Sequence, residues 1–92
     1  MNPNEQAKFL EHVGEYFRQQ RMDKGYTQND IAYLVNKSIR WVQKFEKGQI
    51  DITLSLFIQV SHFLDVPQST VMEYFQHFAY EEYTARTKVL KN

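Results

Sequence analysis

Apolar residues recur at helical spacing along nearly the whole chain, and no segment alternates apolar and polar residues with the period of a strand. The first apolar stripe lies between residues 4 and 22 and consists of Phe9, Leu10, Val13, Tyr16 and Phe17. Its spacing predicts an amphipathic helix. We expect Asn4 to cap the start of this helix and Gly25 to end it.

A second and a third helix follow at short intervals. Thr27 is expected to cap a short helix that ends near Val35, and Ser38 to cap a helix over residues 39–47 that Gly48 ends. Asn36 stands where the second helix must stop, and asparagine tolerates a left-handed conformation better than most residues. The link between the two helices is therefore very short, so they are expected to cross steeply.

The remainder of the chain also has a helical pattern. Thr53 is expected to cap a fourth helix, which residues 65–67 (Asp-Val-Pro) end. Ser69 is expected to cap a fifth helix that continues far towards the C-terminus. The predicted fold class is all-α, a five-helix bundle with an extended C-terminal helix.

The helix over residues 39–47 has two chemically different faces. One face carries Arg40, Gln43, Lys44 and Lys47, and the opposite face carries Trp41, Val42 and Phe45. The apolar face, including Trp41, is expected to join the core, and the other face suits an anion. A steeply crossed helix pair of this kind presents its second helix to the DNA major groove. Taken by itself, the segment is also compatible with a surface helix whose lysines are merely solvated.

Composition restricts the alternatives. The chain has 92 residues, enough for one small domain, and contains no cysteine. It has no apolar run long enough to span a membrane and no signal-peptide pattern at its start, so we expect a cytoplasmic protein without a membrane partner. Its three histidines, His12, His62 and His77, lack ligand spacing, and no phosphate loop or nucleophile motif is present. We therefore expect no enzyme activity, no metal and no cofactor.

The charge is balanced overall but unevenly distributed. Eleven basic and eleven acidic residues give a net charge of zero, whereas many nucleic-acid binders are basic overall. Residues 26–50 carry four basic and two acidic residues, and residues 51–92 carry three basic and five acidic residues. The positive excess therefore coincides with the segment that contains the two-faced helix.

Residues 13–67 resemble a Cro/repressor-type helix-turn-helix domain of the xenobiotic response element family. The resemblance rests on Gly25-Tyr26-Thr27-Gln28, Ile31-Ala32, Val42, Phe45, Glu46-Lys47-Gly48 and Leu64-Asp65-Val66-Pro67. It implies a five-helix DNA-binding bundle whose members are mostly dimeric transcription regulators. The chain departs from the family pattern at Asn36 and Asp65, where glycine is usual, and at Lys37, where an apolar residue is usual. We expect the Lys37 ammonium to reach solvent or phosphate.

The resemblance also implies roles for individual residues. The expected DNA-contacting set is Thr27, Gln28, Lys37, Ser38, Ile39, Arg40, Gln43, Lys44 and Lys47. Gln28 is expected at a phosphate, Arg40 at a guanine and Ile39 at a thymine methyl group. The family carries an ion pair at the positions of Arg21 and Glu46, so we expect a largely buried salt bridge between the first and third helices.

The C-terminal part has apolar residues that a bundle of this size does not need. We expect a homodimer whose interface comprises Leu56, Phe63, Phe75, Phe78, Ala79 and Tyr83, with a monomer whose tail folds back as the alternative. The predicted domains are a DNA-binding unit over residues 4–76 and a dimerisation extension over residues 77–92. The predicted function is a sequence-specific regulator that binds double-stranded DNA and represses transcription. The alternative is an antitoxin or another interaction module that binds a protein partner through its aromatic tail.

Overall fold

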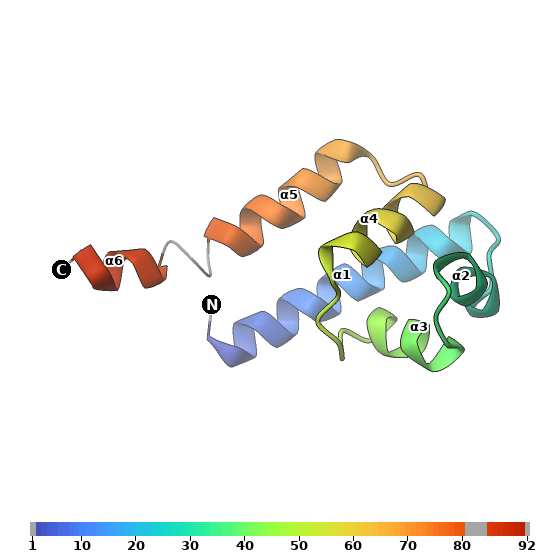
Figure 1. Ribbon diagram of the computed structural model, residues 1–92, viewed down its shortest axis with the longest axis horizontal. Coiled ribbons are helices and arrows are strands. Elements are labelled where there is room, and N and C mark those ends of the chain that lie inside the picture. The colour runs from blue at the N-terminus through green and yellow to red at the C-terminus, as the bar shows by residue number, and fades with distance from the viewer. Residues whose placement is uncertain (1, 81–84, 92) are drawn as a thin grey trace.

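The computed structural model describes residues 2–80 and 85–91 of the chain. The described residues form helices and no strand, as the sequence predicted. The helices are α1 (Pro3–Asp23), α2 (Gln28–Val35), α3 (Ile39–Glu46), α4 (Leu54–Phe63), α5 (Gln68–Ala79) and α6 (Ala85–Lys91). In Figure 1, α2 and α3 lie below the C-terminal half of α1, and α5 runs above it.

One apolar core joins the first five helices. Its buried side chains are Val13, Phe17, Ile31, Ala32, Val35, Val42, Phe45, Phe57, Val60, Leu64 and Val66. Phe17 of α1 lies at the centre, with ring centroids 5.4 Å from Phe45 of α3 and 5.3 Å from Phe57 of α4. These tilted and edge-on arrangements are the ones that aromatic rings prefer. The orientation of α3 is therefore set by packing against α1.

Side chains cap three of the helices as the sequence predicted. The Thr27 hydroxyl accepts a hydrogen bond from the Asp30 backbone N–H at 3.0 Å, and the Asp30 carboxylate accepts one from the Thr27 N–H at 2.8 Å. Ser38 caps α3 by accepting from the Trp41 N–H, and Thr53 caps α4 by accepting from the Leu56 N–H. Each of these bonds satisfies a backbone donor that the first turn of a helix leaves without a partner.

Two of the predicted caps are wrong. Asn2, and not Asn4, caps α1 by accepting from the Glu5 N–H at 2.8 Å, because Pro3 suits the first helical position and moves the start forward. Helix α5 begins at Gln68 directly after Pro67, without a side-chain cap, so Ser69 lies inside the helix.

The orientation of α4 also differs from the expectation. Leu56 and Phe63 were predicted to be left uncovered, but both are half-buried against the core. Leu54 and Ile58, one turn apart, are instead 58% and 52% exposed. Six of the ten residues of this helix are apolar and they are spread around it, so local spacing does not select a buried face, and packing against the neighbouring helices decides it.

The C-terminal part consists of α5 and α6. Phe75 of α5 packs on Phe57, with ring centroids 5.3 Å apart, and Ala79 is exposed. Tyr74 packs against Phe9 and Tyr16 of α1, and its burial raises the pKa of its hydroxyl. Tyr83 and the side chain of Phe78 lie outside the described residues, as does the predicted continuity of the helix between residues 80 and 85.

An ion pair joins the end of α1 to the turn after α4. Lys24 Nζ donates to the Asp65 carboxylate, and this bond lowers the pKa of Asp65. Asp65 has φ 52°, a left-handed conformation in which glycine is the easiest residue to place. The chain thus has at Asp65 a side chain that glycine could not supply, and this side chain links two turns 41 residues apart.

Candidate nucleic-acid interface

The link between α2 and α3 is a tight turn around a left-handed asparagine. Asn36 has φ 56° and ψ 48°, and its N–H and that of Lys37 donate to carbonyls of the last turn of α2. Ser38 is extended and already caps α3. The two short helices are therefore joined by Asn36, Lys37 and Ser38 alone, as the sequence predicted.

The outward face of α3 and the turn before it is polar and accessible. Lys37, Ser38, Arg40, Gln43 and Lys47 are exposed, and Lys44 is half-buried. Ile39, at the first position of α3, is 39% exposed and is the apolar member of this face. We call these seven residues, Lys37, Ser38, Ile39, Arg40, Gln43, Lys44 and Lys47, the α3 surface.

The opposite face of α3 anchors the helix. Val42 is fully buried and Phe45 nearly so, and the half-buried Trp41 ring stacks on Phe45 at 5.6 Å. Trp41 therefore packs on the core, as expected, and is not part of the α3 surface. The two faces of the helix are separated in space as they are in the sequence pattern.

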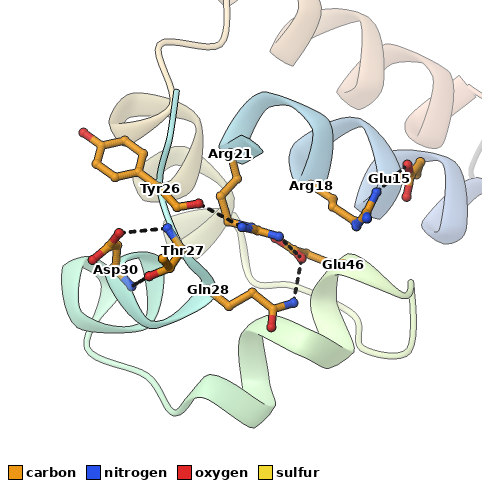
Figure 2. Close-up of polar contacts among 8 residues, drawn as sticks. All are labelled: Glu15, Arg18, Arg21, Tyr26, Thr27, Gln28, Asp30 and Glu46. Carbon is orange, nitrogen blue, oxygen red and sulfur yellow. Dashed lines mark hydrogen bonds and ion pairs between the residues drawn. The ribbon is translucent and has the colours of Figure 1, made fainter. Parts of the chain in front are cut away.

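Arg21 and Glu46 form the expected ion pair between α1 and α3 (Figure 2). Arg21 Nε donates to Glu46 Oε2 at 2.6 Å, and Nη2 donates to Oε1 at 3.2 Å. The Arg21 and Glu46 side chains are only 11% and 4% exposed. Arg21 Nη1 also donates to the Tyr26 carbonyl at 2.8 Å, which lies just before α2. One guanidinium of α1 therefore contacts both the turn into α2 and the end of α3.

Gln28 is half-buried, and its amide is already engaged within the protein. Its Nε2 donates to Glu46 Oε1 at 2.9 Å, so the side chain points towards the end of α3 in Figure 2. The hydroxyl of Thr27 is likewise occupied by the capping interaction at the start of α2. The two residues that were expected to contact phosphate at this helix end thus have structural partners, although Thr27 remains exposed.

Carboxylates border the α3 surface on the side of α1. A hollow of about 400 Å³ is lined by Glu11, Glu15, Arg18, Gln28, Gln43, Glu46 and Lys47. Arg18 Nη1 contacts Glu15 Oε1 at 3.2 Å, and Glu11 and Glu15 are exposed. The sequence did not indicate this border, because residues 11 and 15 are far from residues 43–47 along the chain. The positive charge of the α3 surface therefore gives way to a mixed border of carboxylates and cations beside α1.

Comparison with known proteins identifies the domain. A Cro/C1-type helix-turn-helix family model, of the xenobiotic response element family, matches residues 17–67, which is just over half of the chain. The chain belongs to this helix-turn-helix family. No curated protein matches the chain.

The matched residues include α2 and α3, so these two helices are the helix-turn-helix pair of the family. Such a domain is a DNA-binding regulatory domain and is not typically an enzyme. Within residues 2–80 and 85–91, no cluster of three or more His, Asp or Glu side chains has the arrangement of a metal site. None of the described helices is long and apolar enough to cross a membrane.

Two glycines, Gly14 and Gly48, allow close packing between α1 and the end of α3. The sequence pattern pointed only to Gly48, as the residue that ends the third helix. A Cβ on Gly14 would lie 2.5 Å from the Phe45 carbonyl oxygen and 2.6 Å from that of Glu46. A Cβ on Gly48, which has φ +72°, would lie 2.4 Å from the Glu11 backbone nitrogen. Gly14 sits in mid-helix, where glycine is normally unfavourable, and that position was the available signal that close packing required it.

Proposed function

We propose that this chain is a sequence-specific regulator that binds double-stranded DNA and represses transcription, with α3 lying in the major groove. The observation that carries the proposal is the α3 surface, an exposed polar and cationic face on a helix whose opposite face is fully anchored. A helix presented in this way matches the recognition helix of helix-turn-helix domains in its placement.

The side chains of the α3 surface suit base and phosphate recognition. Arg40 offers the planar pair of donors that binds guanine O6 and N7, and Gln43 offers the donor and acceptor that bind adenine. Ile39 is positioned at the start of α3 and is accessible enough to pack on a thymine methyl group. We assign Lys37, Lys44 and Lys47 to phosphates, because a lysine ammonium contacts phosphate as a point charge.

Thr27 and Gln28 remain part of the proposal, although both side chains already have hydrogen-bond partners within the protein. We propose that the start of α2 meets a phosphate through its backbone N–H groups, with Thr27 at the contact. Gln28 then acts first through Glu46, to which its amide nitrogen donates, and it also lines the hollow shared with Gln43.

We further propose a homodimer in which residues 4–76 bind DNA and residues 77–92 contribute to association. A two-fold dimer sets two recognition helices about 34 Å apart, which is one turn of DNA, so it binds a symmetric operator. The exposed apolar side chains on α4, α5 and α6 support this part of the proposal.

Selection of bound sites from random duplex DNA tests the function. The expected result is a palindromic consensus with half-sites one helical turn apart. Six to ten phosphate contacts per dimer predict a slope of log affinity against log salt of about −5 to −9. Absence of any enriched sequence, or a slope near zero for the enriched one, would contradict sequence-specific DNA binding.

A further inference from the structure

A groove on the side of the molecule formed by α4 and α5 is open and largely apolar. It has a volume of about 560 Å³ and is lined mainly by Ile58, Ser61, Val66, Val71, Met72 and Phe75. Ile58 and Met72 on its two walls are each about half exposed, at 52% and 51%. Exposed apolar residues that meet across a groove favour a docking surface over isolated surface positions.

The groove also contains a polar atom without a partner. Ser61 is 5% exposed, and within the described part of the chain its hydroxyl has no hydrogen-bond partner. This oxygen is buried beneath the groove surface and is not accessible to a docked segment, so contact with an occupant depends on the apolar side chains of the two walls.

Helix α6 exposes apolar side chains that an apolar groove could accept. Its apolar residues Val89 and Leu90 are 75% and 88% exposed. Its seven residues, ARTKVLK, include three basic residues and no acidic one. In Figure 1, α6 extends from the end of α5 away from the other helices.

The charges of the groove region and of α6 are complementary. Residues 51–80, which include both walls of the groove, contain Asp51, Asp65 and Glu73 and no lysine or arginine. Glu73 is exposed next to Met72, whereas Asp65, which lines the groove, is already paired with Lys24. A basic helix with two exposed apolar residues thus matches an apolar groove within an acidic segment.

The direction of the helices indicates which copy of α6 fits the groove. The α5 wall of the groove runs from Gln68 to Phe75, with the exposed Met72 near its middle, whereas α6 follows the end of α5. To reach its own groove, the chain would have to reverse along roughly 10 Å of α5, at 1.5 Å per residue. In a two-fold dimer with antiparallel α5 helices, the end of one α5 lies beside the start of the other.

We infer that α6 of one copy docks in the α4–α5 groove of a second copy, so that two copies exchange their C-terminal arms. Val89 and Leu90 pack against Ile58 and Met72 of the other copy, and the exposed Lys88 of α6 lies over its acidic segment. This inference deepens the proposed dimer and rests on it, but not on DNA binding.

Disulfide trapping between two different variants tests the exchange, and the natural chain has no cysteine to interfere. Met72→Cys and a size-tagged Leu90→Cys protein are mixed without DNA and oxidised mildly. The expected product is a covalent dimer that contains one copy of each variant, at a yield at least tenfold above that of the control. The control pairs Leu90→Cys with Tyr33→Cys, because Tyr33 of α2 is 86% exposed and lies outside the groove.

Sedimentation equilibrium of a second set of variants measures the energetic contribution of the arm. Val89→Asp/Leu90→Asp is expected to raise the dimer dissociation constant at least tenfold, while Tyr33→Asp leaves it unchanged. Far-UV circular dichroism of each variant verifies that it has folded.

Three outcomes would overturn the inference. These are a trapping yield no higher than that of the control, a Met72→Cys/Leu90→Cys double variant that crosslinks only within one chain, and a wild-type chain that is monomeric at tens of micromolar. If the chain is monomeric, α6 does not bind a second copy, and its partner is its own chain or a different protein. Because no DNA is present, failure of the arm exchange is distinguishable from failure of the regulator function.

Discussion

Gln28, the first residue of α2, is hydrogen-bonded to Glu46, the last residue of α3, through Nε2 and Oε1 at 2.9 Å. The same carboxylate accepts two bonds from Arg21 of α1. Three helices therefore meet at one carboxylate, which lines the same hollow as Gln43 and Lys47 of the surface proposed to contact DNA. The geometry of that surface consequently depends on a group that need not contact DNA.

Glu46→Gln is expected to destabilise the fold by about 3–5 kcal/mol, because it leaves the Arg21 guanidinium almost buried without its charge partner. Urea unfolding followed by circular dichroism measures the loss. Glu15→Gln is the matched control, since it removes the carboxylate of the exposed pair with Arg18 and should cost about 0–1 kcal/mol. A loss below 1 kcal/mol for Glu46→Gln would show that the pair is not a structural anchor.

Gly14→Ala is expected to destabilise the fold by about 1–3 kcal/mol, because the added Cβ would meet the carbonyl oxygens of Phe45 and Glu46. The same substitution at an unconstrained position in a helix interior stabilises by about 1 kcal/mol, so the sign itself is the test. Gln19→Ala, at an exposed position of α1, is the control. Unfolding free energies that rise for Gly14→Ala would contradict the close contact between α1 and α3.

Arg40→Ala is expected to weaken operator binding by about 1–3 kcal/mol and to relax the preference at one base position. Fluorescence anisotropy with the selected operator and its single-base variants measures both effects. Lys8→Ala, a change at an exposed cation near the start of α1, is the control and should leave affinity and preference unchanged. A uniform weakening across all sequences would reassign Arg40 to a phosphate.

The Asp65–Lys24 pair predicts a dependence of stability on pH. Lys24 holds the pKa of Asp65 below its ordinary value of 3.8 in the folded protein. The pair therefore stabilises the fold above that ordinary value, and its contribution is lost as pH falls through the lowered folded value. The stability difference between wild type and Asp65→Asn is expected to shrink as pH falls from 6 to below about 3. Asparagine is a suitable replacement because it tolerates the positive φ.

Asp51→Asn is the control for this pH series, because Asp51 is exposed and lies outside the Lys24 contact. Unfolding of all three proteins at matched ionic strength provides the comparison. A difference between wild type and Asp65→Asn that stays constant down to pH 2 would show that the Lys24 contact does not stabilise the folded state.

The sequence by itself determined the features that depend on residues close together in the chain. The caps at Thr27, Ser38 and Thr53, the left-handed end at Asn36 and the two faces of α3 each follow from hydrogen bonding or helical spacing over a few positions. The Arg21–Glu46 pair was predicted only because the chain resembles a family that has it. Local spacing could not identify the partner of Arg21, because Glu46 lies 25 residues away along the chain.

Only the tertiary structure decided the features that depend on which surfaces meet. The clash that excludes a side chain at Gly14, the engagement of Gln28 by Glu46, and the exposure of Leu54 and Ile58 in place of Leu56 and Phe63 all result from contacts between helices. The physical reason is that an apolar or polar pattern states how much of a helix is buried. The pattern does not state which neighbouring helix covers the apolar face. In α4 the apolar residues lie on several sides, so more than one face could be buried equally well.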